Sequence, residues 1–171
     1  MARESSITHL GVADMSQRSA VVTGAASGIG RAVAIRLAED GFDVVLGDIR
    51  RDPITGGEQT EAVIQAAGLS AVHVDADVSS AEDCERLLAT AVERCGTLDV
   101  VVNNAVLAGD HSKPLLDTEP EDWDAMMAVN LRGPYLLCRA AVRRMLEQPL
   151  DGDVRGRIVN ITSQHGMVGA P

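Results

Sequence analysis

The chain reads Thr23-Gly24-Ala25-Ala26-Ser27-Gly28-Ile29-Gly30 directly after a short β-branched run, and a helical pattern begins inside this segment. Ile29, Val33 and Leu37 fall on one face of that helix. Glycines remove side-chain bulk, and the N-terminus of a helix offers unpaired N–H groups at the positive end of its dipole. The segment therefore predicts a strand, a loop that a phosphate can approach closely, and a helix that completes the phosphate site.

The spacing of the glycines limits the alternatives. It follows GxxxGxG, which differs from the GxGxxG fingerprint of other dinucleotide-binding folds. A Walker-type phosphate loop is excluded, because no Gly-Lys-Ser/Thr follows. The remaining alternative is a tight turn whose glycines only permit close packing of the helix.

Five short runs of strand-forming residues alternate with helical patterns: Ala20–Thr23, Asp43–Gly47, Ala71–Val74, Leu98–Val102 and Arg157–Thr162. Strands that are apolar on both faces and separated by helices form a parallel sheet covered on each side. We therefore expect a doubly wound α/β fold of the Rossmann type. The 171 residues, 46% of them hydrophobic, suit one domain over residues 19–171, after a flexible leader over residues 1–18. Flexible insertions are expected at residues 50–57 and 108–114.

Two helical patterns are prominent. One has apolar residues at 3–4 spacing between Cys84 and Cys95, a capping box formed by Ser79 and Glu82, and Gly96 after its end. The other begins near Thr118 as one long helix. It carries an apolar stripe that we expect in the core: Trp123, Met126, Met127, Leu131, Leu137, Cys138, Ala141, Val142 and Met145.

Charge and composition restrict the partners. The formal net charge is -10, which repels a polyanion, so we expect no nucleic-acid partner. Cys84, Cys95 and Cys138 form no CxxC pair and are expected as reduced core residues, which indicates a cytoplasmic protein. No apolar run of eighteen residues or signal-peptide core occurs, so no membrane association is expected.

Polar residues follow several of the predicted strands. Asp48 ends the second, where a carboxylate would accept hydrogen bonds from the adenosine ribose and repel a 2′-phosphate. This favours NAD over NADP, although Arg50 and Arg51 could reach a phosphate. Asp77 follows the third strand and Asn104 the fourth. Asp48 as an ordinary loop carboxylate and Asp77 as a helix cap remain alternatives.

Taken in order, the chain resembles a short-chain dehydrogenase/reductase from about Ser19 to Pro171. The resemblance rests on TGAASGIG, the acidic end of the second strand, Asp77-Val78, Asn103-Asn104-Ala105, Val129-Asn130 and the strand ending in Ser163. It implies hydride transfer between NAD, or NADP less readily, and a small-molecule alcohol or carbonyl. It also implies a set of cofactor-binding residues: Gly24, Ser27, Gly28, Ile29, Gly30, Asp48, Asp77, Val78, Asn104 and Ala105. The family usually has glycine where this chain has Val106.

Asn130 and Ser163 are the catalytic candidates. Asn130 lies on the apolar stripe, so its side chain is expected to be buried. Pro134 has no N–H to donate to the Asn130 carbonyl, and the family's matching asparagine supports a proton relay through a water. A helix kink at which the Asn130 amide only satisfies local backbone is the alternative. The Ser163 hydroxyl could hydrogen-bond a substrate carbonyl. A hydrolase built on Ser163 and His165 is disfavoured, because no GxSxG elbow surrounds the serine.

The chain reaches Pro171 before the position of the family's YxxxK motif. Tyr135 has Arg139 four residues later, and the single lysine is Lys113, so neither takes the acid or lysine role. A polypeptide ending there is expected to lack activity, and a non-catalytic nucleotide-binding fragment is the alternative function. A complete chain is expected to form a homo-oligomer, commonly a tetramer in this family. The substrate cannot be identified from the sequence.

Overall fold

The computed structural model describes residues 18–109 and 114–164. Residues 1–17 of the predicted leader, and the predictions that involve Lys113 and His165, lie outside the described residues.

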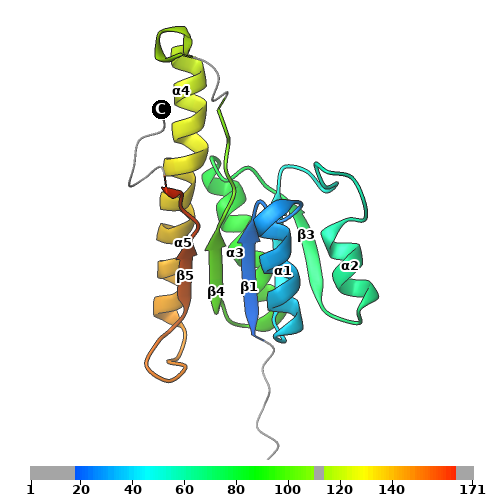
Figure 1. The fold of residues 1–171 in the computed structure, drawn as a ribbon. Coiled ribbons are helices and arrows are strands. Elements are labelled where there is room, and N and C mark those ends of the chain that lie inside the picture. Colours follow the sequence, from blue (N-terminus) through cyan, green and yellow to red (C-terminus); the bar gives the residue numbers. More distant parts are fainter. Residues whose placement is uncertain (1–17, 110–113, 165–171) are drawn as a thin grey trace, which may run out of the picture.

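A parallel sheet forms the centre of the described domain (Figure 1). Its strands are β1 (Ser19–Thr23), β2 (Asp43–Asp48), β3 (Ala71–Asp75), β4 (Val100–Asn103) and β5 (Arg157–Asn160). The order is β3-β2-β1-β4-β5, so the chain reverses its direction of strand addition between β1 and β4. This confirms the expected parallel sheet. The fourth and fifth strands are shorter than predicted, since β4 begins at Val100 and β5 ends at Asn160.

Helices cover both faces of the sheet. Helices α1 (Gly28–Glu39) and α2 (Thr60–Ala66) lie on one face, and α3 (Ala81–Cys95) and α5 (Gly133–Glu147) lie on the other. Each face has its own buried cluster: Leu46 and Ile64 belong to the first, Leu87 and Leu137 to the second. The doubly wound α/β architecture is therefore confirmed. Strand β5, at the edge of the described sheet, is mostly exposed and departs from the expected burial on both faces.

Small residues allow α1 to approach the sheet. Its buried positions are Gly30, Ala34 and Ala38, while Ile29 is 62% exposed. Ile29 is not part of the packed surface, because the small residues one position later in the helical repeat make the contact. The exposed Ile29 therefore lies at the end of the sheet where β1 finishes, beside the glycine loop.

Helix α3 begins one residue later than its sequence pattern suggested. Ser80 is the N-cap, and its side chain accepts a hydrogen bond from Asp83 N at 3.3 Å. The predicted capping box of Ser79 and Glu82 was therefore wrong. Gly96 ends the helix at φ 79, as expected. The hydrogen bond from Asp77 N, followed by the Arg86 contact, lowers the pKa of Asp83.

The cysteines of the described chain are free. Cys84 is buried, whereas Cys95 and Cys138 are only partly buried, so the core prediction holds fully for the first alone. Burial raises the pKa of Cys84 to about 11, and burial followed by the Asp43 charge raises that of Cys95 to about 11. Both groups are therefore thiols at neutral pH.

The predicted long helix is divided. Helix α4 (Pro120–Met127) leads into a π-helical segment, η2 (Ala128–Arg132), and then into α5. A 3-10 turn, η1 (Leu115–Asp117), precedes α4. Figure 1 shows α4 projecting past the end of the sheet. Trp123, Leu131 and Val142 are 54%, 62% and 45% exposed, so the core prediction for the whole stripe was wrong.

The reason for this exposure is geometric. The part of the stripe that faces α3 and β4 is buried, at Leu137, Ala141 and Met145. Trp123 and Leu131 lie past the end of the sheet, where the described residues do not cover them, and Val142 lies on the exposed side of α5. In the described part of the chain, no helix combines the length and apolar character needed to cross a membrane.

Candidate functional site

The end of β1 and the end of β4 are joined by Thr23 and Asn104. Thr23 Oγ1 accepts hydrogen bonds from Asn104 N at 3.0 Å and Ala105 N at 3.1 Å. The Asn104 side-chain Nδ2 donates to Thr23 O at 2.9 Å and to Gly24 O at 3.3 Å. The polar groups at the ends of β1 and β4 are thus hydrogen-bonded to each other, and these bonds hold the start of the glycine loop in place.

Gly24 and Gly30 are required by this close approach. A Cβ on Gly30 would lie 2.1 Å from Gly24 O and 2.4 Å from Asn104 Nδ2. Gly24 has a positive φ of 65, and a Cβ there would lie 2.8 Å from Asn104 Nδ2. The glycine pattern therefore serves local packing in this chain, as one alternative supposed, and the same packing positions the start of α1.

The N-terminus of α1 retains donors for an anion. Ser27 is the N-cap, but its side chain makes no hydrogen bond to the helix amides, and Arg31 N is bonded to Ser27 O at 3.1 Å. The amides of Gly28, Ile29 and Gly30 precede the first intrahelical bond. A Cβ on Gly28 would meet nothing within 4 Å, which leaves room beside these amides. These residues fit the phosphates of a dinucleotide.

Asp48 faces the glycine loop. Its Oδ2 accepts a hydrogen bond from Ala26 N at 3.0 Å, and its Oδ1 accepts one from Arg50 N at 3.1 Å. A carboxylate has about four acceptor positions, so lone pairs remain for ribose hydroxyls. The segment after β2 folds back over the loop, since Ile54 N donates to Ser27 Oγ at 2.7 Å.

The residues after β3 are arranged differently. Asp77 Oδ1 accepts hydrogen bonds from Ser79 N at 2.9 Å and Ser79 Oγ at 2.8 Å. The carboxylate therefore organises the turn before α3, while the cap itself is Ser80. Val78 is 7% exposed, and a Cβ on Gly133 would lie 2.9 Å from its Cγ2. Val78 is thus packed against the start of α5.

Asn130 is bound to the loop after β4. Its Oδ1 accepts a hydrogen bond from Leu107 N at 2.8 Å, and its Nδ2 donates to Leu107 O at 2.9 Å. Asn130 is exposed, so the expected burial was wrong, because η2 lies above the end of the sheet and not within its core. The amide is nevertheless satisfied by the backbone of the segment that continues from Asn104 and Ala105.

The π-helical turn has a cause in the sequence. Pro134 cannot donate a hydrogen bond, and Gly133 N donates to Ala128 O, five residues earlier. The departure from α-helical bonding therefore lies directly before the proline, which has no N–H of its own to donate. The role expected for the Asn130 carbonyl in binding a water stays a prediction.

Ser163 follows β5 at the same edge of the sheet. Ile161 N donates to Asn103 O at 2.9 Å, and Asn103 Nδ2 donates to Asn160 Oδ1 at 2.8 Å. These bonds hold the end of β5 beside the end of β4. Ser163 follows Ile161 by two residues, so it belongs to the segment that leaves the sheet at this end. Because the strand ends at Asn160, regular alternation does not fix the directions of Thr162 and Ser163.

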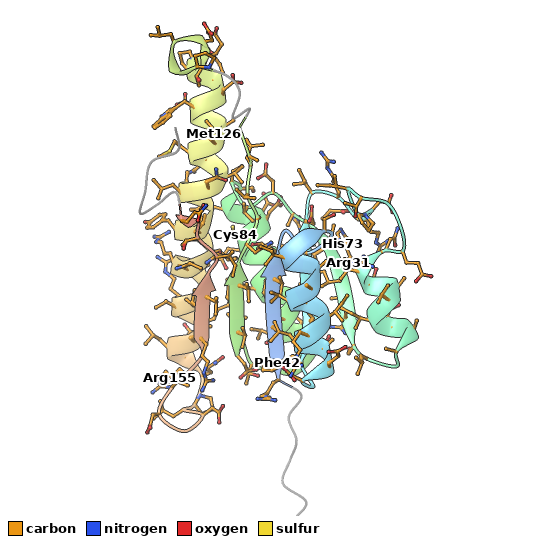
Figure 2. The ribbon with its side chains drawn as sticks, viewed as in Figure 1. Arg31, Phe42, His73, Cys84, Met126 and Arg155 are labelled. Carbon is orange, nitrogen blue, oxygen red and sulfur yellow. The ribbon has the colours of Figure 1, made fainter. Side chains whose placement is uncertain are left out.

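Two threonines were missed as site residues by sequence reasoning. Thr23 joins the two strand ends, and Thr60 Oγ1 donates to Ala25 O at 2.9 Å, which supports the glycine loop from α2. Arg31, labelled in Figure 2, donates to Thr60 Oγ1 at 3.2 Å and to Glu58 O at 2.6 Å. Thr23 could have been found from its place directly before Gly24, whereas nothing in the local pattern marks Thr60.

The fold and this arrangement define a dinucleotide-binding domain of the doubly wound α/β class. A family model described as short chain dehydrogenase matches residues 18–171. The chain therefore belongs to the short-chain dehydrogenase family, whose members bind NAD or NADP.

Relatives with known names support the same family. Glucose 1-dehydrogenase 2 of Bacillus subtilis is 37% identical over 158 residues, covering 92% of this chain and 58% of that protein. A hydroxyacyl-CoA dehydrogenase of Mycobacterium tuberculosis is 42% identical over 161 residues, covering 91% of this chain and 50% of that protein. The chain thus spans between 50% and 58% of the length of these two relatives.

A solved structure agrees with the fold. A short chain dehydrogenase from Mycobacterium avium superposes with a TM-score of 0.76 at 36% identity, covering 88% of this chain and 53% of that one. The likeness therefore extends over most of the chain.

Proposed function

We propose that the protein carrying this chain catalyses reversible hydride transfer between NAD and an alcohol or carbonyl substrate. The observation that carries the proposal is the position of Asp48. Its carboxylate accepts a hydrogen bond from Ala26 N, beside the N-terminus of α1, whose amides receive no side-chain cap. An acidic residue at the end of β2 selects for ribose hydroxyls over a 2′-phosphate. Membership of the short-chain dehydrogenase family supports the oxidoreductase class.

The binding roles follow from position. The amides of Gly28, Ile29 and Gly30 would hold the phosphates, and Asp48 would accept hydrogen bonds from the ribose hydroxyls. Asp77 and Val78 are proposed at the adenine, although Asp77 also stabilises its own turn. Asn104 and Ala105 are proposed beside the remainder of the cofactor, since they continue from β4 next to the glycine loop.

The catalytic roles belong to Ser163 and Asn130 in this proposal. A bound nicotinamide gives or accepts the hydride, and the protein orients the substrate and manages the proton. The Ser163 hydroxyl would donate a hydrogen bond to the substrate oxygen as negative charge develops there. Asn130 would position the proton relay through its carbonyl, while its side chain ties η2 to Leu107. No residue of this chain is assigned the role of general acid.

Substrate and assembly are proposed only as classes. The related proteins are named for glucose and for hydroxyacyl-CoA, and both names denote a compound with a hydroxyl group. A small-molecule alcohol or carbonyl compound is accordingly the proposed partner. A cytoplasmic location and a homo-oligomer, a tetramer in the form the family commonly takes, are also proposed, and the exposed residues Trp123 and Leu131 supply apolar surface for the assembly.

Calorimetric titration of the purified protein with NADH and NADPH tests the cofactor assignment. NADH should bind more tightly. Asp48→Asn, which keeps the size of the side chain and one acceptor oxygen but removes the charge, should narrow the difference. Equal or reversed affinities in the unsubstituted protein would contradict the NAD preference, and binding of neither dinucleotide would contradict the proposed function.

A further inference from the structure

Arg51 carries the positive charge that could favour a 2′-phosphate, so its placement bears on the choice of cofactor. Arg51 Nη2 lies 2.8 Å from Glu61 Oε2. The Arg51 side chain is 52% exposed, whereas the Glu61 side chain is only 16% exposed. The guanidinium is therefore engaged by a carboxylate that is itself largely buried, near the start of α2.

Glu61 is held from a second direction. Its Oε1 accepts a hydrogen bond from His73 N at 3.2 Å, and His73 belongs to β3, the edge strand beside β2. An edge-strand amide that donates to a side chain faces away from the neighbouring strand. Glu61 is thus fixed at the outer edge of the sheet. The preceding residue, Thr60, is bonded to Ala25 O and leaves Glu61 little freedom to move.

The segment that carries Arg51 is fastened on both sides. Arg50 N donates to Asp48 Oδ1 at 3.1 Å before it, and Ile54 N donates to Ser27 Oγ at 2.7 Å after it. The segment therefore has a defined course along the site, and the Arg51 side chain extends from it to Glu61.

The carboxylate of Asp48 and the guanidinium of Arg51, both near the proposed ribose site, point in different directions. Asp48 Oδ2 is bonded to Ala26 N in the glycine loop, toward β1. Arg51 is bonded to Glu61, which contacts the open edge of β3 (His73 is labelled in Figure 2). A cofactor at the glycine loop would therefore meet the carboxylate, while the guanidinium is occupied elsewhere.

We infer that Glu61 is a specificity-determining positioning residue, which holds Arg51 away from the 2′ position of the adenosine ribose and so favours NAD over NADP. The inference rests on the proposed function, because it assumes that the dinucleotide binds at the glycine loop. Guanidinium groups pair with phosphate through two parallel hydrogen bonds. Release of Arg51 from Glu61 therefore gives a 2′-phosphate a partner to offset repulsion by Asp48.

Glu61→Gln tests the inference, since glutamine keeps an acceptor for His73 N but loses the charge that holds Arg51. The ratio of the NADPH Kd to the NADH Kd should fall by roughly 10-fold, as expected for a gained charge-assisted hydrogen bond. The NADH Kd should stay within about 2-fold, because Glu61 does not face the ribose. An unchanged ratio would overturn the inference.

Two further variants assign the effect to Arg51. Arg51→Ala alone should leave the ratio unchanged, and in the Glu61→Gln background it should abolish the gain in NADPH binding. Arg50→Ala in that background is the matched control and should keep the gain. If Arg51→Ala alone weakens NADPH binding, Arg51 already reaches the 2′ position and the inference is wrong. If only Arg50→Ala removes the gain, the wrong arginine has been assigned.

The unsubstituted protein separates the two proposals. If it binds NADH more tightly than NADPH while Glu61→Gln has no effect on the ratio, the proposed function stands and only the role of Glu61 falls. If it binds neither dinucleotide, the proposed function itself is contradicted.

Discussion

The glycine-loop region and the region from α4 to the start of α5 lie at the same end of the sheet (Figure 1). They differ in how far the described residues hydrogen-bond or bury their side chains. Around Thr23 and Asn104, the amides and carbonyls that the two strand ends present are paired with each other. On α4, η2 and the start of α5, Trp123, Leu131 and Tyr135 are more than half exposed. The first region is fixed by its own residues, whereas the second presents apolar surface for further contacts.

Asn130 connects the two regions. It belongs to η2, between α4 and α5, yet both hydrogen bonds of its side chain go to Leu107 in the segment after β4. The amide of Asn130 therefore helps to hold η2 beside the segment that follows β4, in addition to the packing of α5 against α3 and Val78. Substitutions in each region test this difference, beginning with the one of largest expected effect.

Gly30→Ala should break the glycine-loop region. The added Cβ meets backbone and the Asn104 amide at 2.1 and 2.4 Å, so the loop must shift. We expect a loss of about 1–3 kcal/mol in the free energy of unfolding. We also expect a loss of about 3 kcal/mol of NADH binding free energy, which is roughly 10²-fold in Kd. Urea unfolding and calorimetric titration measure the two quantities.

Gly41→Ala is the control for backbone strain. Gly41 has a positive φ of 87, but a Cβ there would meet nothing within 4 Å. It should cost about 1–2 kcal/mol of stability and leave the NADH Kd unchanged. Equal NADH affinity of the Gly30→Ala variant and the unsubstituted protein would mean that the close approach at Gly30 does not shape the cofactor site.

Asn130→Leu should have a smaller effect, confined to turnover. Loss of the two bonds to Leu107 loosens η2, and a misplaced relay slows the proton step. Turnover in the protein that carries this chain should fall by about 10²-fold, the lower end of what general acid–base catalysis contributes. The NADH Kd should stay within about 2-fold, because the glycine loop is held independently. Full turnover across the pH range would show that Asn130 has a structural role only.

The sequence predicted those features that are decided locally. The parallel sheet with its covering helices follows from alternating strands and helices, and Gly96 ends α3 because a residue with positive φ is needed there. The glycine spacing was enough to locate the loop before α1. These features depend on neighbours within a few residues, so the pattern carries them.

Features that depend on distant contacts were predicted less well. Apolar periodicity placed Trp123 and Leu131 in the core, but periodicity does not say how far the helix extends past the sheet. Asn130 was expected to be buried because it lies on the apolar stripe. Its exposure depends instead on where η2 lies relative to β4, which the stripe does not show. The pairing of Arg51 with Glu61 could not be read from the sequence, since it depends on how the segment after β2 folds back to Ser27.

Amide hydrogen exchange with and without saturating NADH tests most directly whether the glycine loop and the end of β4 hold the cofactor. Exchange should slow in peptides covering residues 24–30 and 104–107. The exchange rate of peptides covering α5 should be unchanged. Protection in α5 without protection in the glycine loop, or no protection anywhere with NADH present at saturation, would contradict the account.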